Sequence, residues 1–142
     1  MLTVRHLLDK KSRVLRAIEP DAPVLDAIRS MAEHHVGALV VMHKDELLGI
    51  VSERDYARKV ILLGRSSAHT AVREIMTSPV ITVSPLSTLD ECMRVVTQSR
   101  VRYLPVIENG RVAGVVSIGD LIKAVIEDQQ HTIEQLESYI HS

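Results

Sequence analysis

Two serine–aspartate pairs are the residues whose types and spacing point most directly to chemistry. Ser52 with Asp55, and Ser117 with Asp120, each end a copy of the motif Gly-x-Val-Ser-x-x-Asp. A serine hydroxyl and the free N–H groups of a helix start together suit a phosphate. A carboxylate one turn later can accept hydrogen bonds from two ribose hydroxyls, as in dinucleotide folds. Both copies are therefore candidate nucleotide sites.

The same pairs have a second interpretation, as helix caps. Ser-x-x-Asp ahead of an apolar run is close to the capping box, which is common and needs no ligand. Recurrence in the same register of a repeat favours a ligand site but does not exclude capping. Two classes stay open, a nucleotide-binding module and a ligand-free scaffold for protein interaction or dimerisation.

An internal repeat positions the two motifs. Residues 17–61 align without a gap on residues 82–126, at a constant offset of 65 positions. In each copy a helical period precedes two β-prone runs, joined by Lys44-Asp45 in one and by Asn109-Gly110 in the other. We expect an α/β (α+β) fold of tandem β-α-β-β-α repeats packed sheet to sheet about a pseudo-two-fold axis. The expected domains are 1–65 and 66–129, each with its lead-in helix, and a C-terminal helical extension, 130–142.

Helix signals flank this repeat. Residues 4–8 and 72–76 share a pattern typical of a short lead-in helix ahead of each copy. Asp21 in the first copy, and Ser87 or Thr88 in the second, are candidate caps of the following helix.

The last predicted helix starts near Gly119 and runs to the end of the chain. Ile126, Ile133 and Ile140 recur every seven residues along it, with Leu136 between the last two. This spacing is typical of a short dimer seam. Packing of the helix against its own module explains the same residues, and both interpretations stay open.

Composition excludes several classes. The 142 residues carry a net charge of −1 and contain neither Phe nor Trp, which argues against a nucleic-acid groove or a polybasic membrane patch. Cys92 is the only cysteine, and its alignment with Ala27 predicts a core thiol. No apolar run is long enough to span a membrane, and the N-terminus lacks a signal-peptide core. We expect a cytoplasmic protein.

The adjacent histidines His34 and His35 raise the alternative of an enzyme, a nucleotide hydrolase with a metal bound there. They fall at the end of a predicted helix, where the helix dipole favours histidine without any metal. The sequence shows neither further ligands nor a nucleophile–base arrangement, so we expect no metal and no catalysis.

The chain resembles a cystathionine-β-synthase (CBS) domain pair, or Bateman module, of the small stand-alone bacterial type. The tandem Gly-x-Val-Ser-x-x-Asp, the Tyr103-Leu-Pro-Val strand, the Val-Arg-Glu-Ile-Met lead-in and Ile81-Thr-Val-Ser-Pro carry the resemblance. It implies adenine-nucleotide binding in clefts between the repeats. By this resemblance the second site uses Thr82, Tyr103, Pro105, Ser117 and Asp120. The first uses Ile18, Ala38, Ser52 and Asp55.

The copies differ where charge matters. Arg102 aligns with Gly37, and Arg54 aligns with Gly119, so each arginine is a candidate phosphate ligand present in one copy only. Val40 also stands where the second copy has Pro105. These differences predict two unequal pockets.

The resulting hypothesis is a non-catalytic regulatory module without a catalytic cofactor. It binds AMP, ADP, ATP or an NAD-like dinucleotide, forms a homodimer, and signals energy or redox state to an effector protein that the sequence does not identify.

Overall fold

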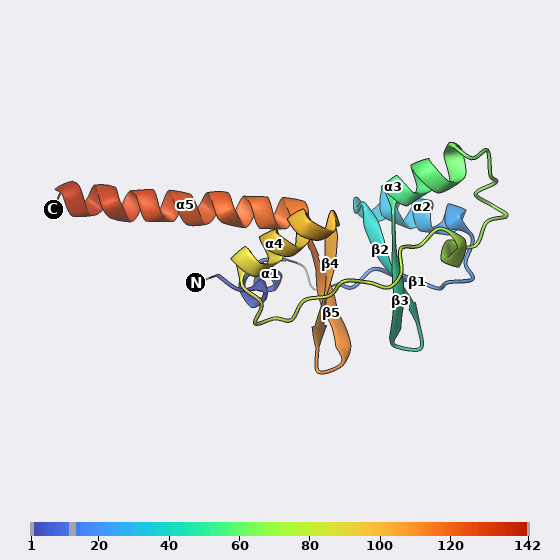
Figure 1. Ribbon diagram of the computed structural model, residues 1–142, viewed down its shortest axis with the longest axis horizontal. Coiled ribbons are helices and arrows are strands. Elements are labelled where there is room, and N and C mark those ends of the chain that lie inside the picture. Colours follow the sequence, from blue (N-terminus) through green and yellow to red (C-terminus); the bar gives the residue numbers. More distant parts are fainter. Residues whose placement is uncertain (1, 12–13, 142) are drawn as a thin grey trace. The chain divides into compact units, whose positions relative to one another are not determined.

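The computed structural model describes residues 2–11 and 14–141 and divides into two compact units (Figure 1). Unit 1 comprises Met1–Arg13, Thr82–Glu108 and Ala113–Ser142, and unit 2 comprises Val14–Ile81 and Asn109–Val112. The elements of unit 2 are β1 (Ala17–Ile18), α2 (Val24–His34), β2 (Ala38–His43), β3 (Glu46–Ser52), α3 (Glu53–Tyr56), a π-helical turn (Ala57–Ile61) and a 3-10 turn (Val72–Glu74). Those of unit 1 are α1 (Val4–Asp9), α4 (Leu89–Ser99), β4 (Tyr103–Glu108), most of β5 (Arg111–Ser117), and α5 (Ile118–His141).

Unit 2 is built on a three-stranded sheet of order β1-β2-β3. β1 runs parallel to β2, and β2 runs antiparallel to β3, with Ala38 opposite Ser52 at one end of the ladder. Because alternate strand residues share a face, Leu39 and Val41 of β2 point to the same side of the sheet and belong to the core of the unit. The buried core of this unit is Val24, Ala27, Met31, Leu39, Val41, Val51, Val60, Val72 and Ile75.

Unit 1 contains β4 and most of β5, the two strands of a hairpin. Asn109 and Gly110 at its turn have φ values of 53° and 77°, the left-handed region that a two-residue hairpin turn requires. The predicted Asn-Gly hairpin is therefore confirmed. The buried core of this unit is Val4, Leu7, Leu8, Leu89, Cys92, Val96, Leu104, Val106, Val116, Leu121 and Ala124. Burial raises the pKa of the Cys92 thiol, which is a core thiol as predicted.

Each lead-in segment packs on the repeat that does not follow it. In unit 1 the backbone N–H groups of Val4 and Arg5 donate to the carbonyls of Ser87 and Pro85, both at 2.9 Å. In unit 2 the N–H group of Val72 donates to the carbonyl of Ala22, at 2.9 Å. The sequence grouped each lead-in helix with the repeat after it. The sequence spacing between a lead-in segment and the repeat after it does not show which of the two repeats that segment packs against.

The mixed α/β fold class is confirmed, whereas the predicted caps are confirmed only in part. Thr88 caps α4, since its hydroxyl accepts from the N–H of Glu91 at 3.1 Å. Pro23, not Asp21, precedes α2, and Asp21 instead pairs with Arg73. The predicted domain boundaries stay a prediction.

Candidate functional site

The second serine–aspartate pair joins the end of β5 to the start of α5. The N–H of Ser117 donates to Oδ2 of Asp120 at 2.8 Å, and the N–H of Asp120 donates to Oγ of Ser117 at 3.1 Å. The N–H of Ile118 donates to the carbonyl of Arg102 at 2.8 Å. This reciprocal pair is a capping box, so the capping interpretation describes these side chains correctly.

The first pair repeats this geometry at the junction of β3 and α3. The N–H of Ser52 donates to Oδ2 of Asp55 at 3.0 Å, and the N–H of Asp55 donates to Oγ of Ser52 at 3.2 Å. The N–H of Glu53 donates to the carbonyl of Gly37 at 3.0 Å, the equivalent of the Arg102 contact. The offset of 65 positions thus extends to single hydrogen bonds.

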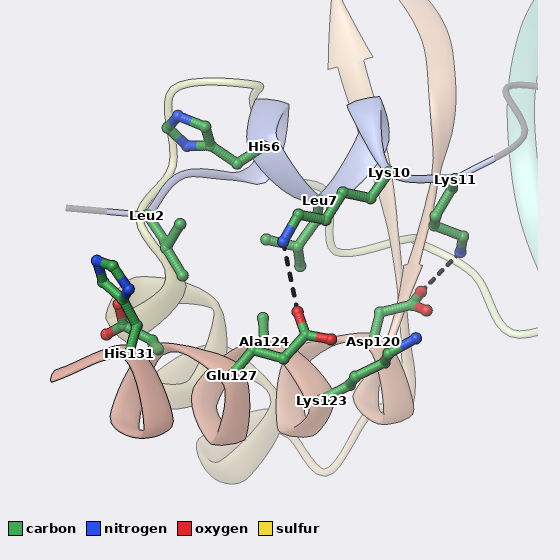
Figure 2. A pocket seen from close by; sticks show the side chains of 11 residues that line it. Leu2, His6, Leu7, Lys10, Lys11, Asp120, Lys123, Ala124, Glu127 and His131 are labelled. Carbon is green, nitrogen blue, oxygen red and sulfur yellow. Dashed lines mark hydrogen bonds and ion pairs between the residues drawn. The ribbon is translucent and has the colours of Figure 1, made fainter. Parts of the chain in front are cut away.

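A lysine lies against the aspartate in each copy, and sequence reasoning missed both lysines. Nζ of Lys11 is 2.6 Å from Oδ2 of Asp120 (Figure 2). It also donates to the carbonyl of Val115 at 2.9 Å. Nζ of Lys59 is 3.1 Å from Oδ1 of Asp55. The spacing of Lys59, four residues after Asp55 on a helix, was a usable signal. Lys11 lies 109 residues from Asp120, and no local spacing reveals it.

Asp120 is held in its ionised form. Partial burial opposes ionisation, but the hydrogen bonds from Lys11 and from Ser117 outweigh it and lower the pKa of this carboxyl below its usual range. At neutral pH the Asp120 carboxylate is therefore a hydrogen-bond acceptor only.

We expect Lys11→Met to lower the free energy of unfolding at pH 7 by about 1 kcal/mol or less, because Lys11 is partly exposed and solvent screens the pair. The Asp120 pKa is lowered by folding, so this contribution is present above the ordinary carboxyl pKa. It is lost as the pH falls below about 4, through the lowered pKa. Urea unfolding of both proteins across this pH range measures the difference.

Lys10→Met is the matched control. Lys10 comes from the same helix end, but its Nζ lies 3.4 Å from Glu127 and both side chains are more exposed than those of the Lys11 pair. We expect a smaller change in stability. An effect of Lys11→Met that does not depend on pH would contradict the assigned pairing.

The other predicted residues of the second site lie around this junction in unit 1. Arg102 is exposed and immediately precedes β4, which Tyr103 begins half-buried. Pro105 is buried, and its carbonyl accepts from the N–H of Val83 at 3.0 Å, which places the exposed Thr82 beside β4.

The predicted residues of the first site divide into two groups. Ala38 pairs directly with Ser52, and Arg54 follows in the first turn of α3, so these lie with Asp55. Ile18 instead pairs with Val41, three residues further along β2, and packs against the unit 2 core. Its side chain is engaged in that core.

A cavity of about 280 Å³ lies in unit 1 between α1 and α5 (Figure 2). Asp120 is the one predicted site residue on its described wall. The remaining lining residues are Leu2, His6, Leu7, Lys10, Lys11, Lys123, Ala124, Glu127, Asp128 and His131. The cavity therefore reaches Asp120 from the side on which Lys11 lies.

Within residues 2–11 and 14–141 there is no group of three or more His, Cys, Asp or Glu side chains able to hold a metal ion. His34 and His35 thus lack described companions for a metal site. In the same part of the chain, no helix has the length and apolar character needed to cross a bilayer.

Comparisons of the sequence and of the structure with known proteins both find CBS-domain proteins. A family model described as CBS domain matches residues 2–61 and 72–127. A CBS-domain protein from Burkholderia ambifaria MC40-6 has 48% sequence identity and a TM-score of 0.86, over 89% of this chain and 96% of that one. A mitochondrial CBS domain-containing protein from Arabidopsis thaliana is 44% identical over 125 residues, or 84% of this chain. That match spans only 61% of the Arabidopsis protein.

A more distant structure carries a ligand. The CBS domain protein from Pyrobaculum aerophilum, solved in complex with AMP, has a TM-score of 0.74 and 23% identity, over 84% of this chain and 89% of that one. At this identity the likeness extends to the fold alone.

Proposed function

Because the chain belongs to the CBS-domain family, with two copies matched at residues 2–61 and 72–127, we propose that it is a non-catalytic regulatory module that binds an adenine nucleotide. The proposed ligands are AMP, ADP, ATP or an NAD-like dinucleotide, bound at the Ser-x-x-Asp motifs. Ligand binding then signals energy or redox state to an effector protein. A homodimer and a cytoplasmic location belong to the same proposal.

The observation that carries this proposal is the state of Asp120. Its carboxylate is partly buried, kept ionised by Lys11 and Ser117, and set one turn into a 24-residue helix. A ribose diol donates to such a carboxylate, and a phosphate suits the helix start beside it. The AMP complex of the Pyrobaculum protein shows that this fold is able to hold an adenine nucleotide.

Further residues of unit 1 have proposed roles around this carboxylate. Arg102 is exposed at the helix start, where its guanidinium can pair with a phosphate. Tyr103, Pro105 and Thr82 flank β4 and are proposed to contact the base. The first copy offers Ser52, Asp55, Arg54 and Ala38 in the same way, and Ile18, engaged in its core, contributes least.

A thermal-shift panel tests the proposal. Protein is unfolded and refolded to remove any co-purified nucleotide, and is then melted with AMP, ADP, ATP and NAD, with GMP as the base control. An adenine ligand at about 100 times its dissociation constant is expected to stabilise the protein by roughly 2.7 kcal/mol. No shift with any of the four adenine ligands would overturn the proposal.

The alternative is a ligand-free scaffold for protein interaction or dimerisation. The reciprocal caps favour it, because each serine and aspartate already satisfies a backbone N–H group of its own helix. Under this alternative the same panel gives identical melting curves, whereas the proposed module responds to adenine ligands.

A further inference from the structure

Helix α5 exposes large apolar side chains along most of its length. Its buried residues, Leu121 and Ala124, lie near its start, and every described residue from Ile126 to His141 is exposed. Figure 1 shows the helix continuing past α1 and α4, which pack on its first part. The exposed large apolar side chains are Ile122 at 46%, Ile126 at 60%, Ile133 at 48%, Leu136 at 58%, Tyr139 at 81% and Ile140 at 73%.

This exposure is costly for a helix without a partner. A helical segment of fewer than about 15 residues is marginal in water unless an apolar face is packed. In the second half of α5 the members of this face, Ile133, Leu136 and Ile140, are all exposed. A partner that covers this face would bury its apolar side chains and stabilise the second half of the helix.

The stripe has the spacing of a coiled-coil seam. Steps of four and three residues connect its members in the order Ile122, Ile126, Gln129, Ile133, Leu136 and Ile140. Alternate steps of this kind keep one face toward a partner helix over the full length. Gln129 is the one polar member, and a single polar seam residue is typical of seams that specify one register.

We propose that this stripe pairs antiparallel with α5 of a second copy of the chain, an interface for the homodimer proposed above that does not depend on nucleotide binding. The sequence is self-complementary in that direction. Ile122 falls opposite the partner subunit's Ile140, and Ile126 opposite the partner subunit's Leu136. Gln129 then meets the partner subunit's Ile133, so every layer contains an isoleucine or leucine on at least one side.

Charge selects the antiparallel direction. Lys123 and Glu137 flank the stripe, and neither forms an ion pair with another described residue. Antiparallel pairing brings Lys123 beside the partner subunit's Glu137 at both ends of the seam. Parallel pairing in register provides no opposite charge for Lys123 and stacks Gln129 on its own copy. The flanking charges therefore favour a second copy of this chain in the antiparallel orientation.

Sedimentation equilibrium of the full chain tests self-association. The variant Ile133→Glu with Leu136→Glu places charges in the seam at positions that are exposed in the single chain, so its fold should survive, as circular dichroism can check. The assembly mass is expected to fall by half, or the dissociation constant to rise at least about 100-fold, because burying unpaired charges is strongly unfavourable. Ser138→Glu, outside the stripe on the same helix, is the control and should associate like the wild type. A monomeric wild-type chain, or equal masses for all three proteins, would overturn the proposal.

Cross-linking tests the direction. Ile126→Cys and Leu136→Cys chains are mixed and oxidised, with Cys92 left in place because it is buried. Antiparallel pairing predicts a disulfide between the two different variants. Ile126→Cys alone should not cross-link, because its two copies lie ten residues, or about 15 Å, apart along the seam. Cross-linked homodimers of Ile126→Cys would show parallel pairing and contradict the assignment.

Discussion

Asp120→Ala is expected to weaken the binding of an adenine nucleotide by about 10- to 100-fold. Hydrogen bonds to a charged group contribute about 1.5–3 kcal/mol, and each 1.4 kcal/mol is a factor of ten in affinity. The substitution removes a carboxylate whose ionised form the hydrogen bonds from Lys11 and Ser117 favour. Isothermal titration calorimetry on nucleotide-free protein measures the change.

Asp120 is also a helix-capping residue, so the experiment needs a variant that loses only a cap. Thr88→Ala is that control, because Thr88 caps α4 in the same unit through the N–H of Glu91. Losing such a cap costs about 1 kcal/mol of stability. Both variants should melt earlier, but only Asp120→Ala should lose affinity. Unchanged affinity of Asp120→Ala together with a lower melting temperature would assign it to capping alone.

The sequence predicted the parts of the fold that local pattern determines. The repeat at a fixed offset, the Asn109-Gly110 turn and the strand–serine–helix junctions all depend on neighbouring residues, and the structure has each of them. The family resemblance is confirmed for the same reason, since it rested on contiguous motifs.

Long-range partners could not be predicted in this way. The Lys11–Asp120 pair joins residues 109 positions apart, and the lead-in helix α1 packs on the second repeat. The ion pair and the packing of α1 both depend on which repeat the N-terminal segment contacts. The spacing of residues within one repeat contains no information about that contact. Strand register likewise sets the position of Ile18, which pairs with Val41 and packs against the unit 2 core, and its assignment to the first site stays a prediction.

The glycine of the first Gly-x-Val-Ser-x-x-Asp motif, Gly49, lies in close contact with a returning segment of the chain. A Cβ at Gly49 would lie 2.9 Å from the carbonyl oxygen of Thr77 and 2.7 Å from Sδ of Met76. Thr77 is bound to the strand by two backbone hydrogen bonds with Ile50, of 2.8 and 3.1 Å. Its hydroxyl is also 3.4 Å from Oδ1 of Asp55. Because Gly49 has no side chain, Met76 and Thr77 can pack directly against β3, and this packing places the Thr77 hydroxyl near Asp55.

Gly49→Ala is expected to lower the free energy of unfolding by about 1–3 kcal/mol, the usual cost of overpacking a close backbone contact. Gly114→Ala, the same change at the equivalent position, should cost less, because the added Cβ would meet Cδ2 of Leu8 at 2.9 Å, the end of a side chain that can rotate. Urea unfolding of both variants measures the difference. Equal costs would mean that the backbone of Thr77 yields as easily as a leucine methyl group, and the role given to Gly49 would then be wrong.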